Sequence, residues 1–455
     1  MNSYLINSKI VCPDRNVDYP VLVKGKGAKL FDEKGKAYID MAGGKAAVAN
    51  IGHGREALGA IFMEQVGQFS ILPTQYFKSF ELENYLQKLA GFTPEGFSKS
   101  WTISSGTEAV ENAIKFSIQY HQLKGEKDRY KILGRWGSYH GNSMFALDVG
   151  GMAIRRNDFM PLLQNFRHAP EAYCYRCPMG LNSEHCDTAC ARALESVILA
   201  EDPSKVAAFI IEPVVGAALG AVPAPEGYLN IIREICDKYG ILMIADEVMT
   251  GFGRTGANFG IENWNITPDI IVMGKGMGSG YYPLSGITVH DDIMDIFETT
   301  NTPFFGGHTY SCNPLGARIG SYVLDVIEEE NLVQKSLENG IYFLQLLSRL
   351  TELPIVGDVR GQGLMTGIEI VQNKETKEPF PADLNMNKII SELALERGVV
   401  LYPGQGSAGK GTGDHILMTP PLVISKDELE EVAEVLYRTL SDVTDTYLIQ
   451  SVDAI

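Results

Sequence analysis

The sequence predicts an α/β protein built on a mostly parallel sheet with helices on both faces. Short apolar runs alternate with amphipathic helical patterns across residues 100–290, which is the rhythm of successive β-α-β units. Two of these runs, at residues 241–245 and 270–273, are soon followed by a charged side chain. This is typical of buried parallel strands that deliver the charge to their carboxyl ends. Between them, residues 225–239 predict a helix with a proline near its start and Gly240 at its end.

Length and composition indicate a globular protein of two domains. With 455 residues the chain exceeds the size of one simple core. Its formal net charge of −17 argues against binding to nucleic acid, which selects basic surfaces. No apolar run approaches the roughly 20 residues that span a bilayer, and residues 1–15 lack the basic and apolar regions of a secretory signal. We therefore expect a cytoplasmic protein without a membrane or nucleic-acid partner.

The first elements that the sequence predicts are short strands separated by glycine-containing turns. These strands lie at residues 21–23, 28–32 and 37–40, after an irregular arm at residues 1–20. Residues 78–90 then carry apolar side chains at helical spacing. We expect this helix to pack against the core and to have no further role.

A helix start after the strand at residues 101–104 predicts an anion site. The free N–H groups and the positive dipole end of a helix attract anions. Gly106 lets a phosphate approach closely, and the hydroxyl groups of Ser105 and Thr107 add hydrogen-bond donors. The alternative for this stretch is a plain capping box, of Ser104 with Thr107 or of Ser105 with Glu108, without any ligand.

The charged strand ends at Asp246 and Lys275 predict a ligand site at one edge of the sheet. Open α/β sheets bind ligands at the carboxyl ends of their strands. Gly274 and Gly276 let a carbonyl compound approach Lys275, whose amine can form a Schiff base. Asp246 can keep a pyridine nitrogen protonated, and this acid–amine pair is the one expected for pyridoxal phosphate. For the two residues taken alone, an ordinary salt bridge is the alternative.

Several motifs in the chain resemble those of the class III, or ω-, aminotransferases, from about residue 20 to about residue 440. The motifs are S-G-T-E-A at 105–109, Y-H-G at 139–141, E-P-V at 212–214, D-E-V at 246–248, G-F-G-R-T-G at 251–256, G-K-G at 274–276 and G-H-T-Y-S-C-N-P at 307–314. The resemblance implies a pyridoxal-phosphate enzyme of fold type I with a large domain and a smaller α+β domain. It implies an N-terminal segment at 1–55 that packs with the small domain, the large domain at 56–319, and the small domain at 320–455.

The resemblance also implies a role for each matching residue. Lys275 carries the cofactor and moves the proton from the donor carbon, and Asp246 keeps the pyridine nitrogen protonated. Tyr139 stacks on the cofactor ring, and Val248 packs against the opposite face. Thr309 reaches the phosphate of the neighbouring subunit, which implies a homodimer, or a dimer of dimers, with shared active sites. The other cofactor contacts that the resemblance implies are Ser105, Gly106, Thr107, His140 and Glu212.

Four cysteines cluster within residues 171–193, a segment that most members of the family lack. They have C-x2-C-x8-C-x3-C spacing and are Cys174, Cys177, Cys186 and Cys190. A reducing cytosol disfavours disulfides, which leaves structural zinc or four reduced, half-buried thiols as the two interpretations. The run Y-C-x-R-C-P at 173–178 is the pattern expected of a sub-branch near taurine and 3-aminobutanoyl-CoA aminotransferases.

The sequence departs from the family where substrates are recognised. Members that act on ornithine or γ-aminobutyrate carry a glutamate at the position of Ala217, which disfavours those substrates. The usual carboxylate-binding arginine is missing, because Leu417 occupies one of its positions and Lys410 lies near the other. Lys410 is therefore a candidate substrate contact, with a solvated loop lysine as the alternative. The glycine-rich loop 404–413 is no nucleotide-binding loop, because Gly411 follows the lysine and a strand pattern comes next.

Together these features predict an aminotransferase that acts by ping-pong kinetics. We expect a donor whose amino group is not α to a carboxylate: an ω- or β-amino acid, a taurine-like compound or a simple amine. The expected acceptor is a 2-oxo acid such as 2-oxoglutarate or pyruvate. An ammonia lyase or decarboxylase on the same scaffold is the alternative, and a non-catalytic cofactor-binding regulator ranks last.

Overall fold

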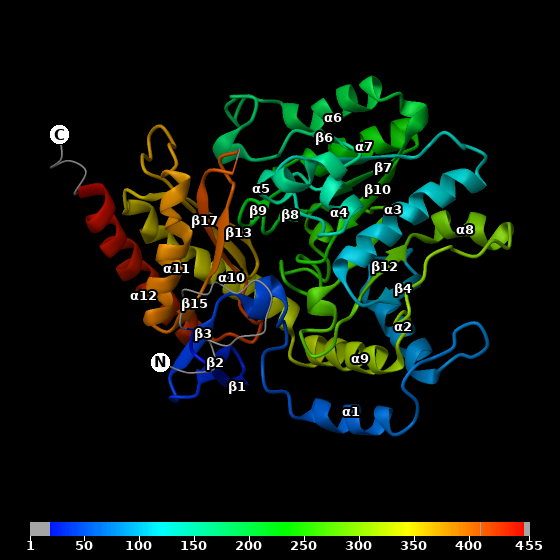
Figure 1. Cartoon of the computed structure of the whole chain (residues 1–455), viewed down its shortest axis with the longest axis horizontal. Coiled ribbons are helices and arrows are strands. Elements are labelled where there is room, and N and C mark those ends of the chain that lie inside the picture. The colour runs from blue at the N-terminus through cyan, green and yellow to red at the C-terminus, as the bar shows by residue number, and fades with distance from the viewer. Residues whose placement is uncertain (1–18, 410, 450–455) are drawn as a thin grey trace.

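The computed structural model describes residues 19–409 and 411–449, and a seven-stranded sheet forms the centre of its larger part (Figure 1). The strands are β4 (Lys99–Ile103), β5 (Lys131–Arg135), β6 (Arg167–Ala169), β7 (Val206–Ile211), β10 (Leu242–Asp246), β11 (Ile270–Met273) and β12 (Ser285–Val289). They run in the order β4-β12-β11-β10-β7-β5-β6, and β12 runs antiparallel to the other six strands. The mostly parallel sheet predicted from the sequence is therefore confirmed.

Helices cover both faces of this sheet. On one face, α6 (Ala189–Ala200) and α7 (Tyr228–Tyr239) pack over strand residues such as Phe209 and Met243. On the other face, α3 (Gly106–Leu123) and α8 (Asp291–Thr299) pack over Ile210 and Ile244. Successive residues of a strand point to opposite faces, so one set of strands supplies two hydrophobic cores.

Three further helices form a layer along one border of the larger part, at the bottom of Figure 1. They are α1 (Ala57–Val66), α2 (Phe80–Phe92) and α9 (Pro314–Glu329), and α9 packs against both of the others. The remaining short elements of this part are α4 (Met144–Val149), α5 (Ala153–Arg156), β8 (Val214–Val215) and β9 (Val222–Pro223).

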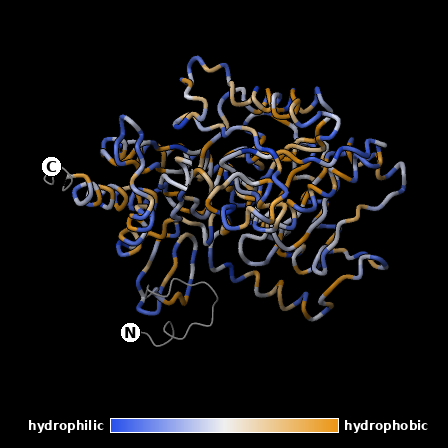
Figure 2. The backbone as a smooth tube through the Cα atoms, turned by 45° about the horizontal axis from the view of Figure 1, so that its top comes forward, coloured by the Kyte–Doolittle hydropathy of each residue, from blue (hydrophilic) through white to orange (hydrophobic). Residues whose placement is uncertain are grey.

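The smaller part contains a second sheet and three helices. Its antiparallel sheet has the order β13-β14-β17-β16, from β13 (Val356–Gln362), β14 (Met365–Ile370), β16 (Tyr402–Gln405) and β17 (Asp414–Met418). Its helices are α10 (Leu332–Leu347), α11 (Met386–Glu396) and α12 (Lys426–Thr444). Hydrophobic and hydrophilic residues alternate along α12, as an amphipathic surface helix requires (Figure 2).

A third sheet joins the beginning of the described chain to the smaller part. It consists of β1 (Leu22–Lys26), β2 (Lys29–Asp32), β3 (Ala37–Asp40) and β15 (Val399–Val400). β15 pairs in parallel with β3, so segments separated by most of the chain lie side by side.

One helix begins at another residue than the sequence pattern suggests. α7 begins at Tyr228 and not at residue 225, because Gly227 has a φ of 71° and is not helical. α9 begins at Pro314, where the Asn313 side chain accepts hydrogen bonds from the first-turn N–H groups. Among the described residues, no helix combines the length and the apolar character needed to cross a bilayer.

Candidate active site

Asp246 and Lys275 lie at the same edge of the large sheet, as their positions in the sequence predict. β10 and β11 are parallel neighbours, and Asp246 at the end of β10 is in register with Val272. Lys275 follows the end of β11 in a short 3-10 turn. Its φ of 44° lies in the left-handed region, which costs a non-glycine residue energy and is found most often at functional positions.

The amine of Lys275 is electrostatically prepared for reaction. Burial lowers the pKa of Lys275 from 10.5 to about 8, while Asp246 and Glu212 act in the opposite direction. An amine with a pKa near 8 is partly in the free-base form at neutral pH, unlike an ordinary lysine. Lys275 can therefore serve as a nucleophile toward a carbonyl and as a proton acceptor.

The carboxylate of Asp246 is buried and held in place from two sides. Its Oδ2 lies 2.7 Å from Nδ1 of His140, and its Oδ1 accepts a hydrogen bond of 3.1 Å from the backbone N–H of Val248. His140 is also buried, and its Nε2 has no hydrogen-bond partner among the described residues. A carboxylate fixed in this way can stabilise a positive charge on a ligand nitrogen.

Glu212 orients the segment that carries Tyr139. The backbone N–H of Tyr139 donates to Oε1 of Glu212 at 3.0 Å, and the backbone N–H of Gly216 donates to Oε2 at 3.0 Å. Burial raises the pKa of Glu212, and these two hydrogen bonds oppose the rise. Glu212 thus acts as an anchor between β7 and the Tyr139 loop, and it positions the aromatic ring beside the cavity described below.

The N-terminus of α3 combines the two interpretations that the sequence left open. Ser105 and Glu108 do form a capping box, with the Ser105 hydroxyl accepting from the Glu108 N–H at 3.2 Å. The Ser105 side chain pairs only with the N–H group at N3. The N–H groups of Gly106 and Thr107 in the first turn therefore remain available to bind an anion. A side chain at position 106 would begin 3.0 Å from a methyl group of Val248, so only glycine leaves the approach open.

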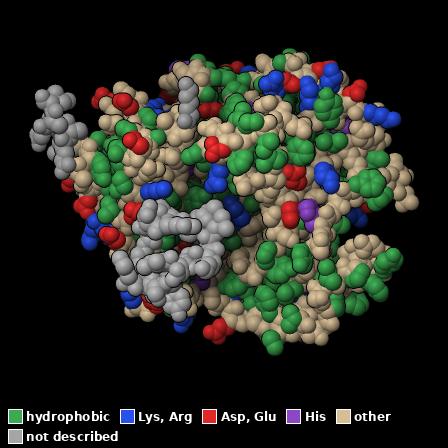
Figure 3. Space-filling model, in the orientation of Figure 1, with side chains coloured by type: hydrophobic (Ala, Val, Ile, Leu, Met, Phe, Trp, Pro, Cys, Tyr) green, Lys and Arg blue, Asp and Glu red, His purple; other side chains and the backbone are tan. Residues whose placement is uncertain are grey.

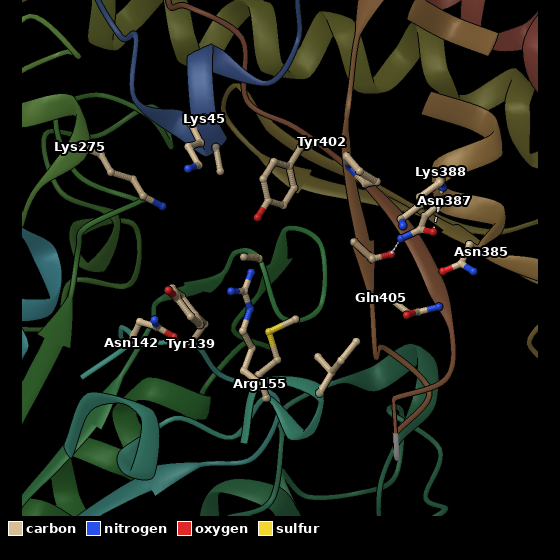
Figure 4. A pocket seen from close by; sticks show the side chains of 16 residues that line it. Lys45, Tyr139, Asn142, Arg155, Lys275, Asn385, Asn387, Lys388, Tyr402 and Gln405 are labelled. Carbon is tan, nitrogen blue, oxygen red and sulfur yellow. Dashed lines mark hydrogen bonds between the residues drawn. The ribbon is translucent and has the colours of Figure 1, made fainter. Parts of the chain in front are cut away.

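A cavity of about 730 Å³ opens above these residues (Figure 4). The side chain of Lys275 points into it from one end, and residues of the smaller part line the other end. Its lining consists of Lys45, Ala46, Tyr139, Asn142, Met152, Ile154, Arg155, Ala217, Lys275, Asn385, Asn387, Lys388, Tyr402, Pro403, Gly404 and Gln405. The reactive amine therefore faces a space large enough for an organic substrate.

The geometry of an acid and a free amine at one sheet edge agrees with the family match. Residues 13–440 match the model of the family described as Aminotransferase class-III, which covers the large sheet, the cavity and the small sheet. This chain is a class III aminotransferase. Its reaction is the transfer of an amino group, and its cofactor is pyridoxal phosphate.

Relatives of this aminotransferase align with it over nearly the whole chain. It is 35% identical to the uncharacterized aminotransferase YodT of Bacillus subtilis, over 97% of this chain and 98% of YodT. It is 35% identical to an adenosylmethionine-8-amino-7-oxononanoate aminotransferase of Geobacter sulfurreducens, over 93% and 92% of the two chains. A thermostable (S)-enantioselective omega-transaminase from Thermomicrobium roseum superposes with a TM-score of 0.89 at 37% identity, over 96% and 97%. The named substrates differ, so similarity alone leaves the substrate of this aminotransferase open.

The residues at the sheet edge fit pyridoxal phosphate by their chemistry. The first-turn N–H groups of α3 suit its phosphate, and the fixed carboxylate of Asp246 suits a protonated pyridine nitrogen. The partly neutral amine of Lys275 suits its aldehyde. Tyr139 and Val248 lie on elements beside these groups and would flank the ring. These are the residues that would hold the cofactor.

Thr309 and Lys410 are the two remaining site residues that the sequence predicts. Thr309 is exposed, lies in the loop before α9 and does not line the cavity of its own chain. Lys410 lies outside the described residues. Ala217 does line the cavity, so no glutamate is present at that point.

The expectation of structural zinc at the cysteine cluster is not supported. Cys174, Cys177, Cys186 and Cys190 face one small hollow and are free thiols. Within residues 19–409 and 411–449, however, no group of three or more His, Cys, Asp or Glu side chains is arranged to hold a metal ion.

The sequence did not reveal the outer half of the cavity. Arg155, Lys388 and Tyr402 line it, and they lie on three segments that carry no motif. The Arg155-Arg156 pair reads as an ordinary basic turn, and nothing in its spacing distinguishes the arginine that faces the cavity. Lys45, in the loop after β3, also lines the cavity.

Proposed function

We propose that this aminotransferase takes its amino group from a donor in which that group is not α to a carboxylate. The donor is an ω- or β-amino acid, a taurine-like compound or an amine, and the acceptor is a 2-oxo acid such as 2-oxoglutarate or pyruvate. The observation that carries the proposal is the cavity itself: Lys275 faces about 730 Å³ of space in which Ala217 replaces the glutamate expected for ornithine and γ-aminobutyrate enzymes.

The residues of the chain divide the chemistry between them. Pyridoxal phosphate, when bound, supplies the carbonyl that accepts the amino group and the ring that accepts the electrons released at the donor carbon. The Lys275 amine, with its lowered pKa, would accept the proton from that carbon and deliver it to the former aldehyde carbon. The carboxylate of Asp246, which His140 fixes, would stabilise a positive charge on the ring nitrogen.

A donor panel tests this proposal. The cofactor-loaded enzyme is mixed with each amine in the absence of a 2-oxo acid, and the change in cofactor absorption is followed. Pyruvate or 2-oxoglutarate is then added, and the aminated product is measured. We expect two separable half-reactions with the wild type, and neither half-reaction with Lys275→Ala. Transfer only from α-amino acids, or release of free ammonia without an acceptor, would contradict it.

We also propose that two copies of the chain complete each other's active sites. Large apolar side chains are exposed on α1, on the segment leading into α2 and in the loop before α9, and they gather at the lower right of Figure 3. They include Met63, Tyr76, Phe77, Phe80, Phe305 and Tyr310. Such a contiguous patch favours association, and the exposed Thr309 lies beside it.

Complementation between subunits tests the shared site. Lys275→Ala subunits and Thr309→Ala subunits are unfolded, mixed, refolded together and assayed. If Thr309 serves the neighbouring site, the mixture regains activity beyond that of either variant, because one mixed site carries both native residues. Activity equal to the average of the two variants, or a monomer in sedimentation, would contradict the proposal.

The boundaries and location of the enzyme complete the proposal. We place the large cofactor-binding domain at 56–319 and the small domain at 320–455, with 1–55 associated with the latter. The pairing of β3 with β15 supports that association. The six cysteines among the described residues are all free thiols, which supports a reducing cytoplasm.

A further inference from the structure

The cavity is strongly cationic although the protein as a whole is acidic. Its described lining includes the side chains of Lys45, Arg155, Lys275 and Lys388, and none of the described lining residues is an aspartate or glutamate. The chain has a net charge of −17, so this local excess of positive charge runs against the overall balance. A pocket of this kind attracts anionic ligands and disfavours cationic ones.

Arg155 is the member of this group best suited to hold an anion. Within residues 19–409 and 411–449, no hydrogen bond or ion pair engages its guanidinium group. The guanidinium lies 5.5 Å from the centre of the Tyr139 ring, and in Figure 4 it points into the cavity between Lys275 and Tyr402. A guanidinium donates two parallel hydrogen bonds to a carboxylate or sulfonate, which a lysine cannot do.

The neighbouring Arg156 anchors the short helix that carries Arg155. Arg156 is buried, and its guanidinium donates to the carbonyl oxygens of Leu147 at 2.9 Å and Gly150 at 2.7 Å, and to Asp148 Oδ1 at 3.3 Å. These bonds anchor the short helix α5 to the end of α4. The backbone of Arg155 is thereby fixed at the cavity rim while its side chain stays available.

We infer that Arg155 binds the acidic group of the substrates, a carboxylate or a sulfonate, in place of the arginine that this chain lacks near residue 417. The inference rests on the proposed transamination and narrows its substrates. The donors are amino compounds that also carry an acidic group, and amines without an acidic group are poor donors. The 2-oxo acid acceptor presents a carboxylate to the same guanidinium, so one cation serves both half-reactions.

The contribution of Arg155 is measured in the donor half-reaction of the cofactor-loaded enzyme. The donors are 3-aminopropanoate, 2-aminoethanesulfonate and, as a compound of similar size without an acidic group, propylamine. The wild type is compared with Arg155→Ala and Arg155→Lys. We expect the preference for the acidic donors over propylamine to fall by roughly 10- to 100-fold in Arg155→Ala, with a smaller fall in Arg155→Lys.

A binding measurement separates recognition from chemistry. Butanoate and propane-1-sulfonate carry the acid but no amine, and their binding to the loaded enzyme is followed by calorimetry. We expect the Kd of at least one of them to rise by roughly 10-fold or more in Arg155→Ala. Which of the two binds better distinguishes carboxylate from sulfonate. The matched control is Lys127→Ala, which removes one exposed, unpaired cation outside the cavity.

The possible results are distinct. If the wild type transfers an amino group from no donor, the proposed function itself is wrong. If the wild type is active but Arg155→Ala loses activity with the acidic donors and with propylamine to the same extent, the role of Arg155 is overturned. The same holds if Arg155→Ala binds butanoate and propane-1-sulfonate as tightly as the wild type. If only Lys45→Ala or Lys388→Ala shows the selective loss, a lysine holds the acid and the inference is again overturned.

Discussion

The lowered pKa of Lys275 makes a quantitative prediction for the apoenzyme. An ordinary lysine of pKa 10.5 is about 0.03% neutral at pH 7, whereas an amine of pKa about 8 is about 10% neutral. At pH 7 the neutral fraction of Lys275 is therefore about 300 times that of an ordinary lysine, so Lys275 should react faster with a carbonyl reagent, and its rate should level off above about pH 8.

Reductive methylation of the apoenzyme with formaldehyde measures this reactivity. The modification of Lys275 is quantified by peptide mass spectrometry between pH 6 and pH 11, with the exposed Lys127 as an internal comparison. In Asp246→Asn the midpoint for Lys275 should shift to lower pH, because the carboxylate raises the pKa of the amine. A midpoint near 10, or a shift to higher pH in Asp246→Asn, would refute the electrostatic argument.

The same shift has a consequence for stability. The unfolded chain keeps the higher pKa of about 10.5, so between about pH 8 and pH 10.5 the unfolded state binds more protons than the native state. Lys275 therefore contributes a rise in the free energy of unfolding across this window, and its buried charge costs stability at lower pH. Urea unfolding of the apoenzyme should show this rise, and Lys275→Met should remove it.

Three further changes test other parts of the structure. Buried Glu369 accepts hydrogen bonds from four side chains. Glu369→Gln should therefore lower the free energy of unfolding, measured in urea, by about 3 kcal/mol. The control Glu375→Gln, at an exposed residue, should change the free energy of unfolding little. Gly106→Ala places a methyl group 3.0 Å from a valine side chain and should weaken pyridoxal-phosphate affinity in an equilibrium titration without unfolding the protein. A thiol reagent should label the exposed Cys174 of the native protein but not the buried Cys236, since burial raises the pKa of the Cys236 thiol to about 12.

The sheet edge with its acid and amine could be predicted because its causes are local. A buried strand shows itself as an apolar run, and the residues that follow such a run lie at the carboxyl end of the strand. This reasoning placed Asp246 beside the strand of Lys275, and the observed register agrees. The start of α3 could be predicted for the same reason, although its serine serves as a helix cap as well.

The cationic cavity could not be predicted because it is assembled from distant parts of the chain. Lys45, Arg155 and Lys388 come from a loop after β3, a four-residue helix and a helix of the smaller part. In the sequence, each of these three residues alone indicates a solvated surface cation. Only the packing of the smaller sheet and of the N-terminal segment against the larger sheet brings them to one space. The site forms only when the chain folds, and no local sequence pattern predicts it.

The arginine of the G-F-G-R-T-G motif takes part in this packing. Arg254 is fully buried, and its guanidinium donates to Oδ1 of Asn50 at 2.7 Å and to the carbonyl oxygens of Leu364 at 2.9 Å and Pro420 at 2.6 Å. One side chain thus ties the larger sheet to the N-terminal segment and to two loops of the smaller part. Because the cavity lies across the same junction, these hydrogen bonds hold together the parts of the chain that line it.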